Sequence, residues 1–244
     1  MMYINDIQIL WYFIIGVVGL GVGYFVDWCN IRLPEYRKCF SREFFTTFLK
    51  CGKPNYILMI LTAVMYVALL YTCGFSLNLV KYLILIPMLL IAFCVDYKHY
   101  IIPNRLTLTM LEVGLVFSFV EGAFNINLAI DRFLGLVVGG GIFLAITLLG
   151  GLVMGKEAMG LGDVKLMGAL GLFLGWRSMI VVALIAFLVG AIISIGLLIT
   201  KVKKTDEYIP FGPFIVVATL VVLYVPFQTI VYALMKIFTL GMYQ

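Results

Sequence analysis

The chain has 244 residues, of which 64% are hydrophobic and only 12% are charged, with a mean hydropathy of +1.14. Because soluble domains carry about a quarter of their residues as charged side chains, this composition excludes an ordinary soluble globular protein. The net charge of +5 does not indicate a nucleic-acid-binding protein, because the basic residues are not gathered with aromatic residues on a soluble segment. We therefore expect an all-α, polytopic membrane protein with one membrane domain, residues 1–244, and no soluble domain.

Eight apolar stretches follow one another along the chain, and most approach the length of about 20 residues that a membrane-spanning helix needs. The sixth is short for a full span, and Pro226 is expected to kink or split the eighth. The first is expected to be an uncleaved helix, because no basic segment precedes it and no small-residue cleavage pattern follows it. In chain order, the stretches are Ile7–Val26, Tyr56–Tyr71, Leu79–Val95, Leu106–Val120, Leu128–Leu149, Val164–Leu174, Ile180–Thr200 and Phe211–Phe238.

The basic residues predict how these helices are oriented. If every stretch spans, 13 of the 17 Lys and Arg residues lie in loops that share one side of the membrane. The positive-inside bias assigns that side to the cytoplasm and both termini to the outside, with the basic loops facing anionic membrane lipids. Asp96 and Asp163 then both lie at the cytoplasmic edge of the membrane, in different loops.

The largest polar segment, residues 30–55, is too short to fold alone. We expect a cytoplasmic connector that is either solvated or lies on the membrane surface as an amphipathic stretch. The segment contains Cys39 and Cys51, but the chain has no C-x-x-C pair, and His99 is its one histidine. Two thiols without further soft ligands make a poor zinc site, so the sequence predicts reduced thiols and no metal.

Asp163 lies in the sequence Gly160-Leu-Gly162-Asp163-Val-Lys165, where an apolar helical stretch begins. The two glycines permit a sharp turn and a close backbone approach. Asp163 could act as the N-cap of the next helix, and spacing alone does not distinguish such a structural cap from a catalytic carboxylate. Lys165 either biases this carboxylate toward ionisation or serves only as a cytoplasmic topology signal.

Asp96 ends the third apolar stretch, seven residues before Pro103. It could simply mark the membrane boundary, although the helix dipole disfavours a carboxylate at a helix C-terminus. Apolar surroundings and this helix end favour the protonated form of Asp96, whereas a helix N-terminus favours the ionised form of Asp163. Two carboxylates with opposite preferences are typical of an acid–base pair such as that of the aspartic proteases.

A third motif, Ile209-Pro-Phe-Gly-Pro-Phe214, leads into the last apolar stretch. Its Pro210, Gly212 and Pro213 prevent the helix from starting early and predict a rigid, kinked helix start. From the residues alone, an ordinary helix start explains this motif equally well.

Four segments together resemble the prepilin leader peptidase family, the membrane aspartic proteases of type IV pilus, type II secretion and competence systems. They are GYFVDWCNIRLP, DYKHYIIPNRLT, KEAMGLGDVKLMGALGLFLGW and IPFGPF, and they occur in the family's order between positions 23 and 214. The resemblance implies an eight-helix protein of the bacterial inner membrane whose catalytic aspartates match Asp96 and Asp163. It also implies type IV prepilin or pseudopilin substrates, which are cut on the cytoplasmic side just before their hydrophobic helix.

The chain departs from the family in its first cytoplasmic loop. Many members carry two C-x-x-C pairs there and also N-methylate the new amino terminus with S-adenosylmethionine. Residues 30–55 contain no such pair, and Gly23-Tyr-Phe-Val-Asp27 replaces the family's usual Gly-Ser-Phe-Leu-Asn. The peptidase is expected to need no cofactor, whereas methyl transfer, with S-adenosylmethionine as its cofactor, is left open.

Three alternatives to the peptidase remain open from the residues. A presenilin-like protease also uses Gly-x-Gly-Asp, but that group has a Pro-Ala-Leu tripeptide, which does not occur in this chain. A proton-coupled transporter would use the carboxylates as a relay, but such groups are more often near the membrane midplane than at one face. A non-catalytic membrane scaffold would not need the two aspartates.

Overall fold

The computed structural model describes residues 3–4, 7–35, 37, 39, 54–154, 159–200 and 209–239. Most of the polar segment 30–55 therefore lies outside the described residues. Nearly all of the described chain is helical, and its strands are the antiparallel pair β1 (Tyr3–Ile4) and β2 (Ile7–Gln8). The prediction of an all-α polytopic membrane protein is confirmed. The helices are α1 (Ile9–Arg32), α3 (Tyr56–Cys73), α4 (Leu77–His99), α5 (Asn104–Phe124), α6 (Ile126–Met154), α7 (Leu161–Leu174), α8 (Trp176–Ile199), α9 (Gly212–Tyr224) and α10 (Phe227–Phe238).

Six of the described helices are long and apolar enough to cross a membrane, namely α1, α3, α4, α5, α6 and α8. The last predicted stretch is broken at Pro226, as expected, into α9 and α10, which are bent by 117° and count as a seventh span if taken together. The sixth predicted stretch forms α7, whose 14 residues extend about 21 Å, less than the roughly 30 Å of a bilayer core. Each of the eight apolar stretches is therefore mostly helical, but the first begins in strand β2, and α7 is too short to qualify as a span by itself.

The chain divides into two compact units, residues 1–106 and 107–244. In the first unit, α1 packs closely on α3, and α4 contacts both. A Cβ atom at Gly19 would come within 2.6 Å of the Ala63 Cα, so only glycine permits this approach of the two backbones. Helix α4 contains Pro87, which has no N–H to donate to the Leu83 carbonyl four residues earlier. The Tyr66 hydroxyl of α3 donates to that carbonyl instead.

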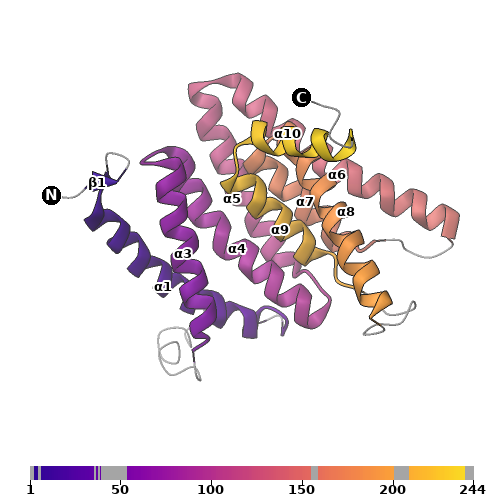
Figure 1. Ribbon diagram of the computed structural model, residues 1–244, viewed down its shortest axis with the longest axis horizontal. Helices are drawn as coiled ribbons and strands as arrows, with labels where there is room; N and C mark the ends of the chain where they lie inside the picture. The colour runs from indigo at the N-terminus through magenta and orange to yellow at the C-terminus, as the bar shows by residue number, and fades with distance from the viewer. Residues whose placement is uncertain are drawn as a thin grey trace. The chain divides into compact units, whose positions relative to one another are not determined.

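In the second unit, α7 lies among α6, α8 and α9, each of which contacts it (Figure 1). Residues 166–174 of α7 are all buried. Glycines make this close packing feasible, because a Cβ atom at Gly171 would overlap the backbone of Gly135 in α6. The Ser118 hydroxyl of α5 also donates to the Leu172 carbonyl of α7 at 3.3 Å. The 14-residue helix α7, too short to span a membrane alone, is therefore the central helix of its unit.

Candidate active site

Asp163 lies in the first turn of the central helix α7 and is 4% exposed. The hypothesis that Asp163 is the N-cap is wrong, because Gly160 occupies that position with an extended backbone (φ −69°, ψ 138°). The helix therefore begins at Leu161, and the Asp163 N–H donates to the Gly160 carbonyl at 3.1 Å. Its carboxylate still lies where the positive end of the helix dipole favours the ionised form.

Asp96 lies in the last turn of α4 and is also 4% exposed. The helix continues past the predicted end at Val95 to His99, so Asp96 is inside the helix rather than beyond it. Tyr100 ends the helix in a left-handed conformation (φ 57°), and its N–H donates to the Asp96 carbonyl at 2.9 Å. The negative end of the helix dipole therefore disfavours an ionised carboxylate at this position.

Burial makes both carboxylates costly as simple markers of a membrane boundary. Moving an ionised carboxylate out of water costs several kcal/mol unless polar groups or charges compensate for the lost hydration. Neither Asp96 nor Asp163 lacks an interaction partner in the protein. Asp96 belongs to the first unit and Asp163 to the second, so each unit supplies one member of the proposed pair. Their action as a pair stays a prediction.

The structure places the other predicted residues of the Gly-x-Gly-Asp motif around the start of α7. Gly160 is the N-cap, and Gly162 belongs to the first helical turn. Lys165 is an exposed residue of the same helix. Because residues two apart do not face each other on a helix, a direct effect of Lys165 on Asp163 is disfavoured by this geometry, and its role stays a prediction.

The two proline-containing motifs both precede helices. Pro103 is buried directly before α5, and its carbonyl accepts the Leu106 N–H at 3.0 Å. Helix α9 begins at Gly212 with Pro213 in its first turn, and Pro210 is buried just before it. Helix α9 therefore starts within the Pro-Phe-Gly-Pro motif and not before it, whereas a rigid kink and a role in shaping an active site stay predictions.

An aromatic cluster holds this helix start and was not predicted from the sequence. The Phe211 ring lies 5.2 Å from the ring of Phe187 in α8 and 5.9 Å from that of Phe143 in α6, measured between centroids. Phe214 contacts Phe211 edge-to-face at 5.7 Å. The four phenylalanines come from α6, from α8 and from α9 with its N-cap, so no local pattern in the sequence could identify them as a group. They fix the position at which α9 leaves the Pro-Phe-Gly-Pro turn.

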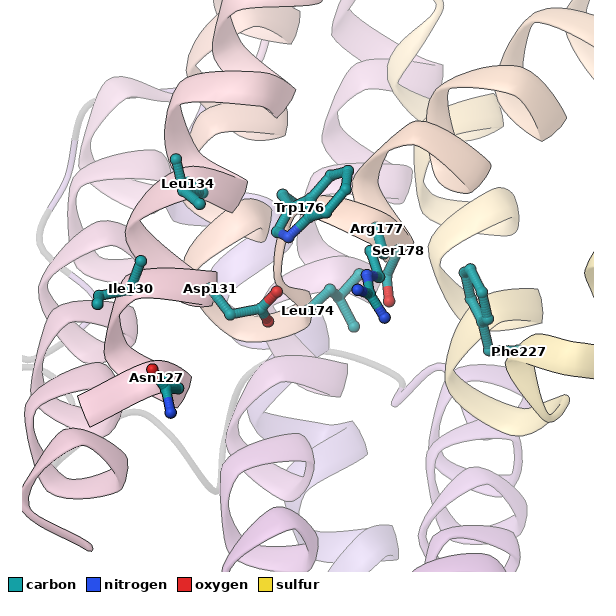
Figure 2. Close-up of a pocket in the computed structure, with 9 residues that line it drawn as sticks. All are labelled: Asn127, Ile130, Asp131, Leu134, Leu174, Trp176, Arg177, Ser178 and Phe227. Atoms are coloured by element: carbon teal, nitrogen blue, oxygen red, sulfur yellow. The ribbon is translucent and has the colours of Figure 1, made fainter. Parts of the chain in front are cut away.

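A cleft of about 440 Å³ lies at the opposite end of α7 from Asp163 (Figure 2). It is bordered by Leu174 at the end of α7, by Asp131 of α6 and by Trp176 and Arg177 at the start of α8. This cleft is therefore separate from the carboxylate at the start of α7. Within the described ranges, no group of three or more His, Cys, Asp or Glu side chains is arranged to hold a metal ion. The prediction of a metal-independent site stays a prediction.

Known proteins with similar sequences include members of one peptidase family. Residues 83–195, which include both aspartates, match the type IV leader peptidase family. The chain is 33% identical over 159 residues to a prepilin leader peptidase/N-methyltransferase of Aeromonas hydrophila, covering 65% of this chain and 54% of that protein. It is 31% identical over 196 residues to the protein of that name from Pseudomonas aeruginosa, covering 78% and 64%. The chain thus spans about half to just under two thirds of these curated relatives, and no solved structure matches it.

Proposed function

We propose that the chain is an aspartic endopeptidase of the bacterial inner membrane, a proposal supported by the match of residues 83–195 to the type IV leader peptidase family. Its proposed substrates are type IV prepilins or pseudopilins, which it cuts at the cytoplasmic face, just before their hydrophobic helix. The observation that carries the proposal is the placement of two carboxylates, each 4% exposed, at helix ends of opposite dipole sign within the matched segment. A boundary marker would not need burial at either position.

The helix ends support a division of roles between the two aspartates. Asp163, at the start of α7, is the ionised base that accepts a proton from water while the water oxygen attacks the scissile carbonyl carbon. Asp96, at the end of α4, is the protonated acid that donates its proton to the carbonyl oxygen as the tetrahedral intermediate forms. Collapse of the intermediate then breaks the C–N bond, and the leaving amine takes up a proton. Such a mechanism predicts a bell-shaped dependence of the rate on pH, and a flat profile across the acidic range would contradict it.

The proposed peptidase needs no cofactor. The relatives are named for a second activity, N-methyl transfer, for which S-adenosylmethionine would be the methyl donor. We leave this activity out of the proposed function, because this chain has none of the C-x-x-C pairs that many members carry in the first cytoplasmic loop. The mass of the mature amino terminus of a processed substrate decides the question, since a methyl group adds a fixed mass to it.

Co-expression with a prepilin in bacterial membranes tests the proposed function. Either Asp96→Asn or Asp163→Asn should abolish removal of the leader peptide while the protein still accumulates, because each change keeps the side-chain shape and removes the carboxylate. Asp131→Asn is the matched control, since Asp131 lies by the cleft at the other end of the second unit. Processing that survives both single changes would reject the aspartic mechanism, and loss of processing in the control would show that the assay measures folding.

A further inference from the structure

The end of α1 holds a segment of the chain that follows it. The Trp28 indole N–H donates to the Cys39 carbonyl at 3.1 Å, across eleven residues of sequence. The Arg32 guanidinium lies over the Trp28 ring at 4.1 Å from its centroid and so packs against the indole on the same helix turn. Trp28 is 3% exposed and Arg32 is 9% exposed. These buried contacts fix the backbone of Cys39 against the last turn of α1.

This placement brings two thiols together. The side chains of Cys29 and Cys39 hydrogen-bond to each other. Cys29 is 2% exposed, whereas Cys39 is partly exposed, so a small polar reagent reaches Cys39 first. The hydrogen bond from Cys29 lowers the pKa of Cys39, and the positive charges of Arg32 and Arg105 lower it further, while partial burial opposes the shift. Cys39 thus has the accessible, electropositive surroundings that are typical of a reactive cysteine.

We propose that Cys39 and Cys29 form a peroxide-sensitive thiol pair, in which Cys39 is the attacking thiolate and Cys29 is the resolving thiol. The Cys39 sulfur attacks one oxygen of hydrogen peroxide, the O–O bond breaks, and the products are a sulfenic acid at Cys39 and one water after protonation. The Cys29 sulfur then attacks the Cys39 sulfur, the S–O bond breaks, and a second water leaves with the Cys29 proton. Two thiols are oxidised to one disulfide, and one peroxide is reduced to two waters.

The other described cysteines do not offer the same arrangement. Cys94 of α4 has a side-chain hydrogen bond with Asn30 rather than with a thiol. Cys73 ends α3 and makes a weak contact with the Thr72 hydroxyl at 3.7 Å. Disulfides that form in a reducing compartment are usually transient and redox-sensing rather than structural, and the proposed disulfide is of this kind. The oxidised form would tie the start of the polar segment covalently to α1.

Peroxide treatment of the purified chain in detergent, followed by alkylation of the remaining thiols and mass spectrometry, tests the proposal. After reductant is removed, hydrogen peroxide should remove two of the five alkylatable thiols and join the peptides that contain Cys29 and Cys39. The protein should lose the mass of two hydrogen atoms, and reductant should restore both thiols. Cys73 is the internal reference, and it should still be alkylated at the peroxide dose that oxidises the pair.

Single substitutions separate the roles of the two thiols. In Cys29→Ala, Cys39 should still react, but the product should be a sulfenic acid that dimedone traps. Cys39→Ala should leave Cys29 reduced, and Cys51→Ala should leave the disulfide unchanged. Alkylation of Cys39 at the same rate as Cys73, or a disulfide between Cys39 and Cys51 in the unsubstituted chain, would overturn the proposal. These measurements do not depend on peptidase activity, so they stand or fall separately from the proposed function.

Discussion

Substitution of Gly139 by alanine tests whether close backbone packing positions the central helix α7. A Cβ atom at this position of α6 would lie 2.6 Å from the Met167 carbonyl oxygen of α7 and 2.9 Å from the Met179 Cε of α8. The carbonyl cannot rotate away as a flexible side chain could, so the two helices must separate. Overpacking of this kind lowers the free energy of unfolding by about 1–3 kcal/mol. The higher helix propensity of alanine offsets about 1 kcal/mol of this loss.

Gly141 of the same helix is the matched control, because a Cβ atom there would meet nothing within 4 Å. Gly141→Ala should therefore keep the gain of up to about 1 kcal/mol in helix propensity. The two variants are expected to differ by about 1–3 kcal/mol, with Gly139→Ala the less stable. At roughly 2–4 °C per kcal/mol for a chain of this size, the difference in Tm should be several degrees.

Thermal unfolding of both variants in the same detergent measures this difference. Leader cleavage should also fall in Gly139→Ala relative to Gly141→Ala, because α7 carries Asp163. Equal Tm values would refute the claim that the α6–α7 approach depends on glycine. A normal rate of cleavage despite a lower Tm would show that the position of α7 matters for stability alone.

Three further predictions concern stability. Tyr66→Phe should lower the unfolding free energy by about 1–3 kcal/mol, because it leaves the Leu83 carbonyl of the Pro87 turn without its donor; thermal unfolding measures this, and an unchanged Tm would contradict it. Glu121→Gln should lower the free energy of unfolding by up to about 3 kcal/mol, because the mostly buried Arg132, 2.8 Å from Glu121, keeps its charge. Replacing both residues with apolar ones should restore much of this stability in thermal unfolding. If the double replacement restores none of it, the cause is not electrostatic. Tyr100→Gly should raise the free energy of unfolding, measured with a chemical denaturant, by about 1 kcal/mol, because glycine adopts φ 57° without strain. A lower free energy of unfolding would mean that contacts of the tyrosine ring stabilise the protein by more than the strained backbone destabilises it.

The sequence predicted the helices well, because the length and apolar character of each stretch decide whether it crosses a membrane. It also predicted the break at Pro226, since proline lacks the N–H that would continue the helix. The bend of 117° could not be predicted, because the angle depends on what α9 and α10 pack against. The central position of α7 could not be predicted either. It depends on glycines of α6 and α7 that face each other in space, and the spacing of residues along one helix does not reveal such a contact.

Local features at the two aspartates were predicted less well. Asp163 looked like an N-cap because aspartate is favoured there, but the backbone of Gly160 already adopts the extended conformation that the cap requires. The left-handed Tyr100 had no signal at all, since glycine and asparagine usually occupy such positions. The Cys29–Cys39 contact depends on a tertiary hydrogen bond from Trp28, which spacing along the chain does not reveal.

The rate of leader cleavage by purified Asp96→Asn and Asp163→Asn, each compared with Asp131→Asn, tests the central claim most directly. If Asp96 at the end of α4 is the acid and Asp163 at the start of α7 is the base, each of the first two changes should lower the rate by roughly 10²–10⁴-fold, and the Asp131 variant should cleave at close to the normal rate. All three proteins should show the same Tm within a few degrees. Cleavage by Asp96→Asn or Asp163→Asn at a rate near that of the unsubstituted protein would contradict the assignment of that residue to catalysis.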